Sequence, residues 1–179
     1  MQQEIEIRIP EDRIGVLIGK EGEIKKRIQE KTGCKIKINS KTGDVKIIRG
    51  EDAIGFLKAK SVVEAIAKGF NPEIAMKLLE DDFYVFESID LSDLSQKELE
   101  RVKGRVIGKE GKFRKIIEET LNVHVSVYDK YVSIIGPFEN VAAAREAINM
   151  LIEGAQHSTV QRFMEKKKRE ISMRSMEWY

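Results

Sequence analysis

A glycine–lysine–glutamate–glycine turn occurs twice in the sequence, at residues 19–22 and 108–111. Glycine has no Cβ, so the backbone of such a turn can approach a ligand closely. A helix that starts directly after the turn points its unpaired N–H groups at the same place, together with the positive end of its dipole. A phosphate group suits that combination, and the lysine of each turn adds a cation. The predicted phosphate-binding loops are Gly19, Lys20, Glu21 and Gly22 in the first copy, and Gly108, Lys109, Glu110 and Gly111 in the second.

The plainer interpretation is that the glycines only make a tight turn between two helices, and for a lone Gly-x-x-Gly pair it would be preferred. Here the turn recurs with its lysine in basic surroundings: residues 101–115 carry seven basic side chains and a single acid. Glu21 and Glu110 count mildly against a phosphate site, because an acid should avoid phosphates unless it points outward. The repetition nevertheless favours phosphate binding.

The two turns belong to a duplicated domain. Between residues 14–28 and 103–117, eight of fifteen positions are identical at a constant offset of 89. The apolar alternation Ile36/Ile38 recurs as Val125/Val127 at the same offset. A chance match would not extend into a shared apolar pattern. We therefore expect two copies of one domain, over residues 1–82 and 83–179.

Apolar periodicity and helix boundary signals predict the elements that hold each turn. In the first copy we expect a strand at residues 5–9, then a helix capped by Asp12 and ending at Ile18, and a second helix ending at Thr32. Two strands should follow, at 36–38 and 45–48. The copy should end with a helix over 52–68, which places Leu57, Val62, Ala65 and Ile66 in the core, and a further helix from Asn71 to about Glu80. The second copy inserts nine residues before its turn, with a capping box at Ser95, and adds a basic helix that starts near Ser158. The predicted fold class is α+β.

A groove beside each turn would complete the predicted site. One wall would come from the short helices and the basic residues that follow the turn, and the other from the second strand of each copy. Bases in a narrow aliphatic slot need no aromatic stacking, so an aromatic content of 7% is no objection. The plainer interpretation of the aliphatic side chains is ordinary core. The predicted groove residues are Gly15, Ile18, Lys25, Lys26, Ile36 and Ile38, with Gly104, Arg105, Ile107, Arg114, Lys115, Val125 and Val127 in the second copy.

With these residues the sequence resembles two type I KH domains, which implies an order βααββα around a three-stranded antiparallel sheet in each copy. The pattern Ile-Gly-Lys-x-Gly, a helix ending in Thr-Gly and an Ile-x-Ile strand carry the resemblance. It implies that each module grips about four nucleotides of single-stranded RNA or DNA. In one respect the sequence departs from the family, because Lys25 and Arg114 stand where an aliphatic groove residue is usual. This departure suggests a more electrostatic grip.

The tandem arrangement is similar to a narrower group, the archaeal counterparts of the eukaryotic "partner of Nob" small-subunit assembly factors. The run from Lys103 to Lys109, the Ile-Ile-Gly at 134–136 and the basic C-terminal helix carry this likeness. It implies binding near the 3′ end of small-subunit ribosomal RNA and cooperation with the endonuclease that matures it. Eukaryotic members have a degenerate first loop, whereas residues 19–22 are intact here, so both modules are expected to contact RNA.

Two other classes of function stay open beside RNA binding. An adaptor for proteins, for instance in translation initiation, would use the basic C-terminal helix or the acidic stretch at residues 80–100. An enzyme is less favoured, because the paired acids Asp81–Asp82 and Glu118–Glu119 point to different faces of a helix and His124 lies in a strand among valines. We therefore expect a non-catalytic protein.

The amino-acid composition limits which cofactors, membrane segments and cellular location we expect. The 179 residues carry a net charge of +2, with 35% of them charged. No apolar run approaches the ~18 residues of a membrane span, and no secretory signal pattern opens the chain. The one cysteine, Cys34, is expected to be buried or half-buried, and a single cysteine excludes an internal disulfide. We expect a cytoplasmic monomer with no cofactor, no metal and no membrane partner.

Overall fold

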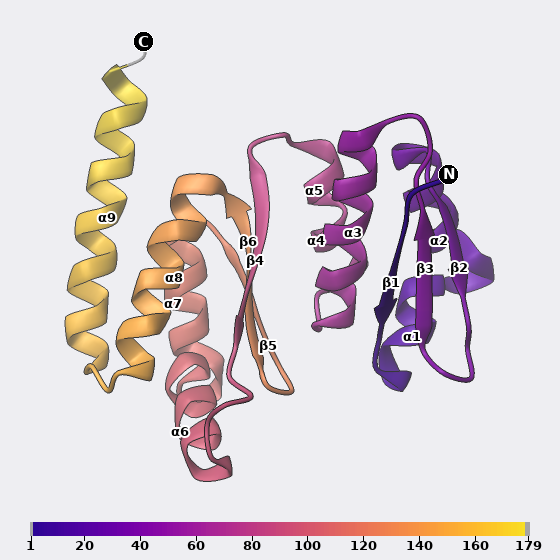
Figure 1. Cartoon of the computed structure of the whole chain (residues 1–179). Helices are drawn as coiled ribbons and strands as arrows, with labels where there is room; N and C mark the ends of the chain where they lie inside the picture. The colour runs from indigo at the N-terminus through magenta and orange to yellow at the C-terminus, as the bar shows by residue number, and fades with distance from the viewer. Residues whose placement is uncertain (1, 178–179) are drawn as a thin grey trace. The chain divides into compact units, whose positions relative to one another are not determined.

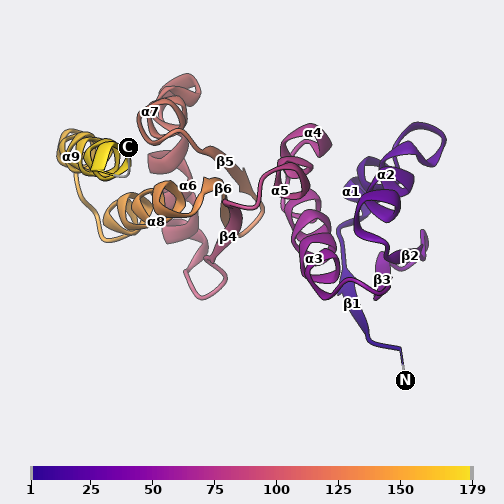
Figure 2. The same ribbon diagram turned by 90° about the horizontal axis from the view of Figure 1, so that it is seen from above.

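The computed structural model describes residues 2–177. The chain forms two compact units, and the boundary between them along the sequence falls between Asp82 and Phe83. Each unit contains a three-stranded antiparallel sheet with its helices packed on one face, as Figures 1 and 2 show. The strand orders are β1-β3-β2 and β4-β6-β5, so the last strand of each sheet lies between the other two. The predicted α+β class and the duplication of the domain are confirmed.

The first unit follows the order strand, helix, helix, strand, strand, helix. Its elements are β1 (Glu4–Arg8), α1 (Glu11–Ile18), α2 (Glu23–Thr32), β2 (Lys35–Ile38), β3 (Asp44–Ile48) and α3 (Ala53–Ala67), followed by α4 (Pro72–Ala75) and α5 (Lys77–Glu80). Alternate residues of β2 and β3 are buried, which places Ile36 and Ile47 opposite each other on the helix-covered face. Gly33 ends α2 in the left-handed conformation, as the Thr-Gly pair predicts. Cys34 is buried, as expected.

The second unit repeats this order, with a longer first helix and a long helix at its end. Its elements are β4 (Tyr84–Asp90), α6 (Gln96–Ile107), α7 (Lys112–Leu121), β5 (His124–Tyr128), β6 (Tyr131–Pro137), α8 (Phe138–Ile152) and α9 (His157–Glu177). The Ser95 hydroxyl accepts a hydrogen bond from the backbone N–H of Glu98, which confirms the predicted cap of α6. The inserted residues form the turn before α6 and lengthen that helix to 12 residues, against 8 for α1.

Three local predictions are wrong. Helix α1 begins at Glu11, so Asp12 lies inside its first turn and Pro10 occupies the cap position. The helix expected from Asn71 to Glu80 is divided at Met76 into α4 and α5, although Asn71 does cap its start. Leu57 is 63% exposed, because the buried face of α3 runs through residues such as Phe56, Val63 and Ala59 instead.

Helix α9 forms the outermost layer of the second unit. It packs against α7 and α8, which separate it from the sheet (Figure 1). Val160 and Met164 on its inner face are fully buried in the core of the unit. Within residues 2–177, no helix combines the length and apolar character that crossing a bilayer requires.

Candidate nucleic-acid interface

The two glycine turns have nearly the same backbone conformation. Gly19 has φ 78° and ψ 173°, and Gly108 has φ 72° and ψ 176°. The third residue of each turn, Glu21 or Glu110, has φ 56° and ψ 27°. The left-handed region is uncommon for residues other than glycine, so the same unusual conformation at both glutamates indicates one loop design used twice.

The first and last glycines of each turn serve different purposes. A Cβ added to Gly19 would lie 2.5 Å from Ile24 Cγ1, and one added to Gly108 would lie 2.7 Å from Phe113 Cβ. The first glycine is therefore needed for packing inside the unit. A Cβ on Gly22 or Gly111 would meet nothing within 4 Å. The last glycine thus leaves open space beside the backbone, where a ligand can approach.

Helices α2 and α7 begin at these open glycines without a side-chain cap. By contrast, Asp52 caps α3 and Ser95 caps α6. The first N–H groups of an α-helix have no partner within the helix, and together with the helix dipole they favour an anion. Inside each turn the N–H groups of Glu23 and Lys112 donate to the carbonyls of Lys20 and Lys109. Each turn therefore places a helix start without a side-chain cap beside an exposed lysine, Lys20 or Lys109. This is an arrangement suited to a phosphate group.

The residues around the turns are distributed as a binding surface requires. Gly15 and Gly104 are exposed, and a Cβ on either would enter open space, so the helix backbone before each turn is accessible. Ile18 and Ile107 are half-buried, and Lys26 and Lys115 are exposed. Each turn is thus flanked by bare backbone and one aliphatic side chain before it, and by a lysine after it.

Side chains of α2 and α7 tie these helices to the edge strands β2 and β5. The backbone N–H of Ile36 donates to Gln29 Oε1 at 2.8 Å, and that of Val125 donates to Glu118 Oε2 at 3.0 Å. In the second unit Arg114 Nη1 also donates to the Val125 carbonyl at 3.4 Å. The sequence analysis missed the roles of Gln29 and Glu118, although the offset of 89 aligns them.

Two predicted groove residues do not lie on the surface where they were expected, and a third, Arg105, is half-buried. Ile36 and Val125 are 1% and 2% exposed, so they belong to the core and offer no contact to a ligand, whereas Ile38 and Val127 are half-buried. The Arg105 guanidinium donates to the Ala155 carbonyl at 3.4 Å, in the connection before α9. Arg105 shares a helix face with Arg101, whose guanidinium bonds the end of α8.

A hydrogen-bonded turn closes β2 onto β3 beside the half-buried Ile38. Asn39 Oδ1 accepts from the backbone N–H of Lys41 at 3.0 Å. Hydrogen bonds from Thr42 and Arg8 lower the pKa of the Asp44 carboxyl below its ordinary value. The carboxylate form of Asp44 thus helps to hold this turn in place.

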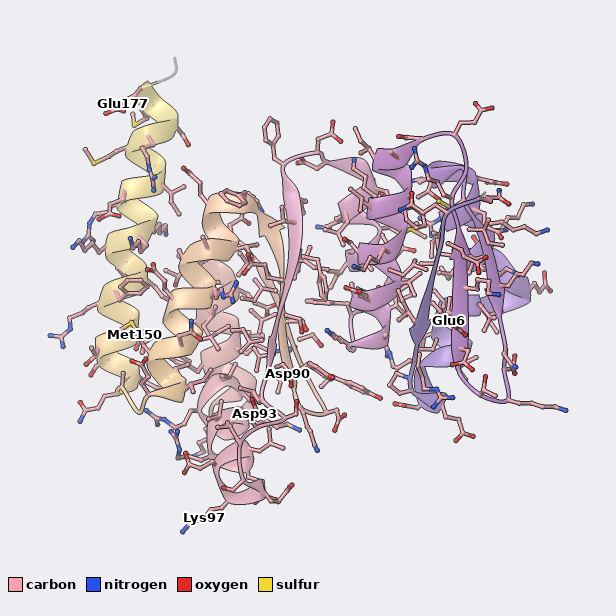
Figure 3. The ribbon with its side chains drawn as sticks, in the orientation of Figure 1. Glu6, Asp90, Asp93, Lys97, Met150 and Glu177 are labelled. Carbon is pink, nitrogen blue, oxygen red and sulfur yellow. The ribbon has the colours of Figure 1, made fainter. Side chains whose placement is uncertain are left out.

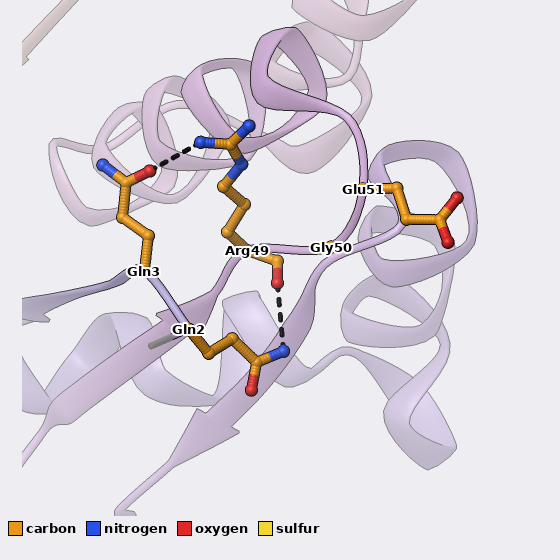
Figure 4. Close-up of a pocket in the computed structure, with 5 residues that line it drawn as sticks. All are labelled: Gln2, Gln3, Arg49, Gly50 and Glu51. Carbon is orange, nitrogen blue, oxygen red and sulfur yellow. Dashed lines mark hydrogen bonds between the residues drawn. The ribbon is translucent and has the colours of Figure 1, made fainter.

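A separate pocket of about 490 Å³ lies where the start of the chain meets the connection between β3 and α3 (Figure 4). Arg49 Nη1 donates to Gln3 Oε1 at 2.8 Å, and Gln2 Nε2 donates to the Arg49 carbonyl at 3.2 Å. The Glu51 side chain points away from the side chains of Gln2, Gln3 and Arg49 (Figure 4). Because Gln2, Gln3 and Arg49 already bond one another, this pocket is a weaker candidate for a binding site than the glycine turns.

Comparison with protein families matches both units. A KH domain model matches residues 4–65, and a model described as a eukaryotic type KH-domain (KH-domain type I) matches residues 85–169. A KH domain-containing protein of Methanocaldococcus jannaschii is 45% identical over 170 residues, which cover 92% of this chain and 74% of the relative. A pre-rRNA-processing protein PNO1 of Phaeosphaeria nodorum is 34% identical over 131 residues. That match covers 70% of this chain, which spans only half the length of this eukaryotic relative.

Solved structures share the fold over nearly the whole chain. A crystal structure of an a/eIF2alpha–aDim2p–rRNA complex from Pyrococcus horikoshii OT3 contains a chain that is 43% identical, with a TM-score of 0.87 and coverage of 94% of this chain and 96% of that one. The order of elements, the duplicated glycine turns and these matches agree. The chain belongs to the KH-domain family, as a tandem type I KH protein homologous to the PNO1 and Dim2p proteins.

Proposed function

We propose that the protein binds single-stranded RNA through its two glycine turns, without catalysis, and acts in the processing of small-subunit ribosomal RNA near its 3′ end. The observation that carries this proposal is the repeated turn itself, with an open glycine, an exposed lysine and an uncapped helix in both units. KH modules use such a turn to clamp about four nucleotides by their backbone.

The relatives support the choice of RNA and of process. PNO1 of Phaeosphaeria nodorum is described as a pre-rRNA-processing protein, and the Dim2p relative was crystallised in a complex with rRNA. The residues around the turns fit that ligand, because exposed backbone and lysines suit phosphates while Ile18, Ile38, Ile107 and Val127 retain apolar surface for bases.

A binding experiment with the full chain tests the proposal. The variant Lys20→Asp/Glu21→Asp/Lys109→Asp/Glu110→Asp places acids in both turns without altering their packing. Fluorescence anisotropy with an unstructured oligouridine should show an affinity at least about tenfold lower than that of the wild type, because charge-assisted hydrogen bonds contribute ~1.5–3 kcal/mol each. A thermal melt should show that the variant remains folded.

The matched control is Lys60→Asp/Lys97→Asp, which changes the net charge by the same amount at one lysine per unit outside the turns. Figure 3 shows Lys97 projecting outward from the start of α6. The control should bind RNA as the wild type does. Equal affinity of the wild type and the turn variant would reject the proposal.

A second function, as a docking partner for a translation initiation factor, is favoured by one specific observation. The Dim2p relative shares its crystal structure with a/eIF2alpha as well as with rRNA. Association with the initiation factor that persists after nuclease treatment and in the turn variant would establish this role beside RNA binding. Loss of association under both conditions would show that RNA alone bridges the two proteins.

A further inference from the structure

Helix α9 carries three basic side chains on its outward face, Arg162, Lys166 and Arg169, which we call the basic stripe. All three are exposed. At 100° per residue they fall within an arc of about 60°, and they are spaced about 6 Å and about 4.5 Å apart along the helix axis. The opposite face of α9 holds the buried Val160 and Met164. The stripe therefore points away from the unit, into solvent.

Two other basic residues of α9 form ion pairs with nearby acids, whereas the stripe forms none. Lys168, on the side of α9 that shares a pocket with α7, is exposed and also has no ion pair among the described residues. Lys167 lies 3.8 Å from Glu146 and 3.5 Å from Glu170, and Arg174 lies 3.3 Å from Glu139. These pairs cover the flank of α9 that faces α8. No ion pair joins the stripe to any described residue, although two acids flank it on the helix, Glu165 on one side and Glu170, which pairs with Lys167, on the other. The outward face of α9 thus carries three cations that have no ion-pair partner among the described residues.

The start of α9 is fixed directly behind the second glycine turn. The His157 ring stacks on Phe113 with 3.8 Å between centroids and an interplanar angle of 5°. His157 Nε2 donates to the Arg105 carbonyl at 2.8 Å. Phe113 is the residue whose Cβ would touch a side chain at Gly108. Phe113 therefore contacts both the second glycine turn and the first residue of α9, and this shared contact fixes the position of the stripe relative to the turn.

Helix α7 supplies basic residues between the turn and the stripe. Arg114 and Glu118 mark the side of α7 that bonds β5, and Thr120 marks the side that shares a pocket with Lys168 of α9. On a helical wheel the exposed Lys112 and Lys115 lie in the arc between those two sides. Lys112 pairs with Glu110 at 4.0 Å, and the exposed Glu119 lies in the same arc, so the basic path from Lys109 toward α9 runs through Lys115.

We propose that the basic stripe binds the phosphate backbone of the RNA strand where it continues beyond the nucleotides held by the second glycine turn. The inference rests on the proposed function and extends its site. The occupant is a nucleic acid backbone, because the three cations are exposed, form no ion pair with a described residue and lie on a helix whose start packs against the second glycine turn. Long arginine and lysine side chains on an exposed helix suit phosphates that need no fixed base sequence.

The test compares two oligouridine probes, of about five and about fifteen nucleotides, on the full chain. The variant Arg162→Gln/Lys166→Gln/Arg169→Gln should bind the longer probe about tenfold more weakly than the wild type near 0.1 M salt, and bind the shorter probe equally well. The slope of log affinity against log salt should fall by about 2, since each phosphate contact to a single strand contributes ~0.7.

A matched control removes the same charge elsewhere in the second unit. In Lys97→Gln/Arg145→Gln/Arg174→Gln all three residues are exposed, and Arg145 and Arg174 are already paired with Glu87 and Glu139. This variant should bind both probes as the wild type does. An equal loss in the control would mean that net charge alone matters, and the proposal would fall.

Two further outcomes separate the alternatives. If the stripe variant binds both RNA probes normally but loses binding of a polyglutamate peptide, the stripe docks an acidic protein and the RNA proposal is wrong. The turn variant described above is measured in parallel. If that variant keeps its affinity while the stripe variant loses affinity for the longer probe, the proposed function of the turns fails and the stripe stands as an RNA contact.

Discussion

At the scale of single residues, the glycine turns combine a position that packing demands with a position that a ligand needs. Gly19 has a backbone conformation open almost only to glycine, and it lies against the side chain and backbone of Ile24. Gly22 is also left-handed, but the space beside it is open. The same contrast holds for Gly108 and Gly111. Substitutions should therefore separate the stability of the turn from its binding.

Replacing each glycine of the first turn by alanine makes that separation measurable. Gly22→Ala should lower the free energy of unfolding by about 1–2 kcal/mol, the cost of a left-handed alanine. Gly19→Ala should cost more, because a steric clash with Ile24 adds to the backbone strain. Urea denaturation measures both. Equal losses for the two variants would contradict the assignment of Gly19 to packing.

Sequence reasoning succeeds at these residues where the chemistry is local. A Gly-Lys-Glu-Gly turn between helices has few structural solutions, so its conformation follows from residue types and is found twice. The exposure of Ile36 and Val125 was mispredicted, because an apolar strand pattern does not say which face the helices cover. Nor does it say that Arg105 turns toward the connection before α9.

At the scale of elements, an arginine on the first helix of each unit binds carbonyl groups at the C-terminal end of the helix that follows the sheet, α3 or α8. Arg13 of α1 donates to the carbonyl of Ile66 at 2.8 Å, in the last turn of α3, and to that of Phe70 at 2.6 Å, just after the helix ends. Arg101 of α6 donates to the carbonyl of Ile152 at 2.7 Å, at the end of α8. A cation there satisfies terminal carbonyls and complements the helix dipole. The sequence pattern did not predict this contact, since it joins residues about 50 positions apart.

The arginine contact predicts a loss of stability without a loss of the turn. Arg13→Ala should lower the free energy of unfolding by about 2 kcal/mol, because two charged hydrogen bonds to partly buried carbonyls disappear. Arg13→Lys should recover part of the loss, since lysine keeps the charge but not the two-pronged geometry. Chemical denaturation of the three proteins gives the comparison. No change in Arg13→Ala would show that the bonds contribute nothing.

The turn between β2 and β3 should respond to acid through Asp44. Hydrogen bonds from Thr42 and Arg8 lower the pKa of Asp44 in the folded state, so folding favours its carboxylate form. The stabilising contribution is therefore complete above the unfolded pKa, near 4, and is lost as the pH falls through the lower folded pKa. An NMR titration of the Asp44 carboxyl should give a pKa below that of unfolded aspartate, and Thr42→Val should raise it. A pKa at or above the unfolded value would refute this assignment.

At the scale of the whole molecule, the two units repeat one fold with unequal charge around the turn. Residues 19–26 carry three basic and two acidic side chains, whereas residues 108–115 carry four basic and one acidic. The duplication and the order of elements follow from the sequence, because a constant offset and a shared apolar period leave one consistent topology. The division at Met76 and the His157–Phe113 stack depend on tertiary packing that no local pattern encodes.

The unequal charge predicts unequal salt dependence of RNA binding. Disabling the second turn by Lys109→Asp/Glu110→Asp should reduce the slope of log affinity against log salt more than disabling the first by Lys20→Asp/Glu21→Asp. The second turn has more cations to exchange for counterions, at ~0.7 per phosphate contact. Anisotropy titrations over a range of salt concentrations measure both slopes. A larger reduction from the first-turn variant would contradict the charge argument.

The central claim is that the open ends of both glycine turns hold RNA phosphates, and an NMR titration tests it most directly. The full chain, labelled with ¹⁵N, is titrated with an unstructured oligouridine of about six nucleotides. The account predicts that the backbone amides of Gly22 and Glu23, and those of Gly111 and Lys112, show the largest chemical-shift changes. Shifts concentrated at another surface, such as the pocket around Arg49, with these four amides unmoved, would contradict it.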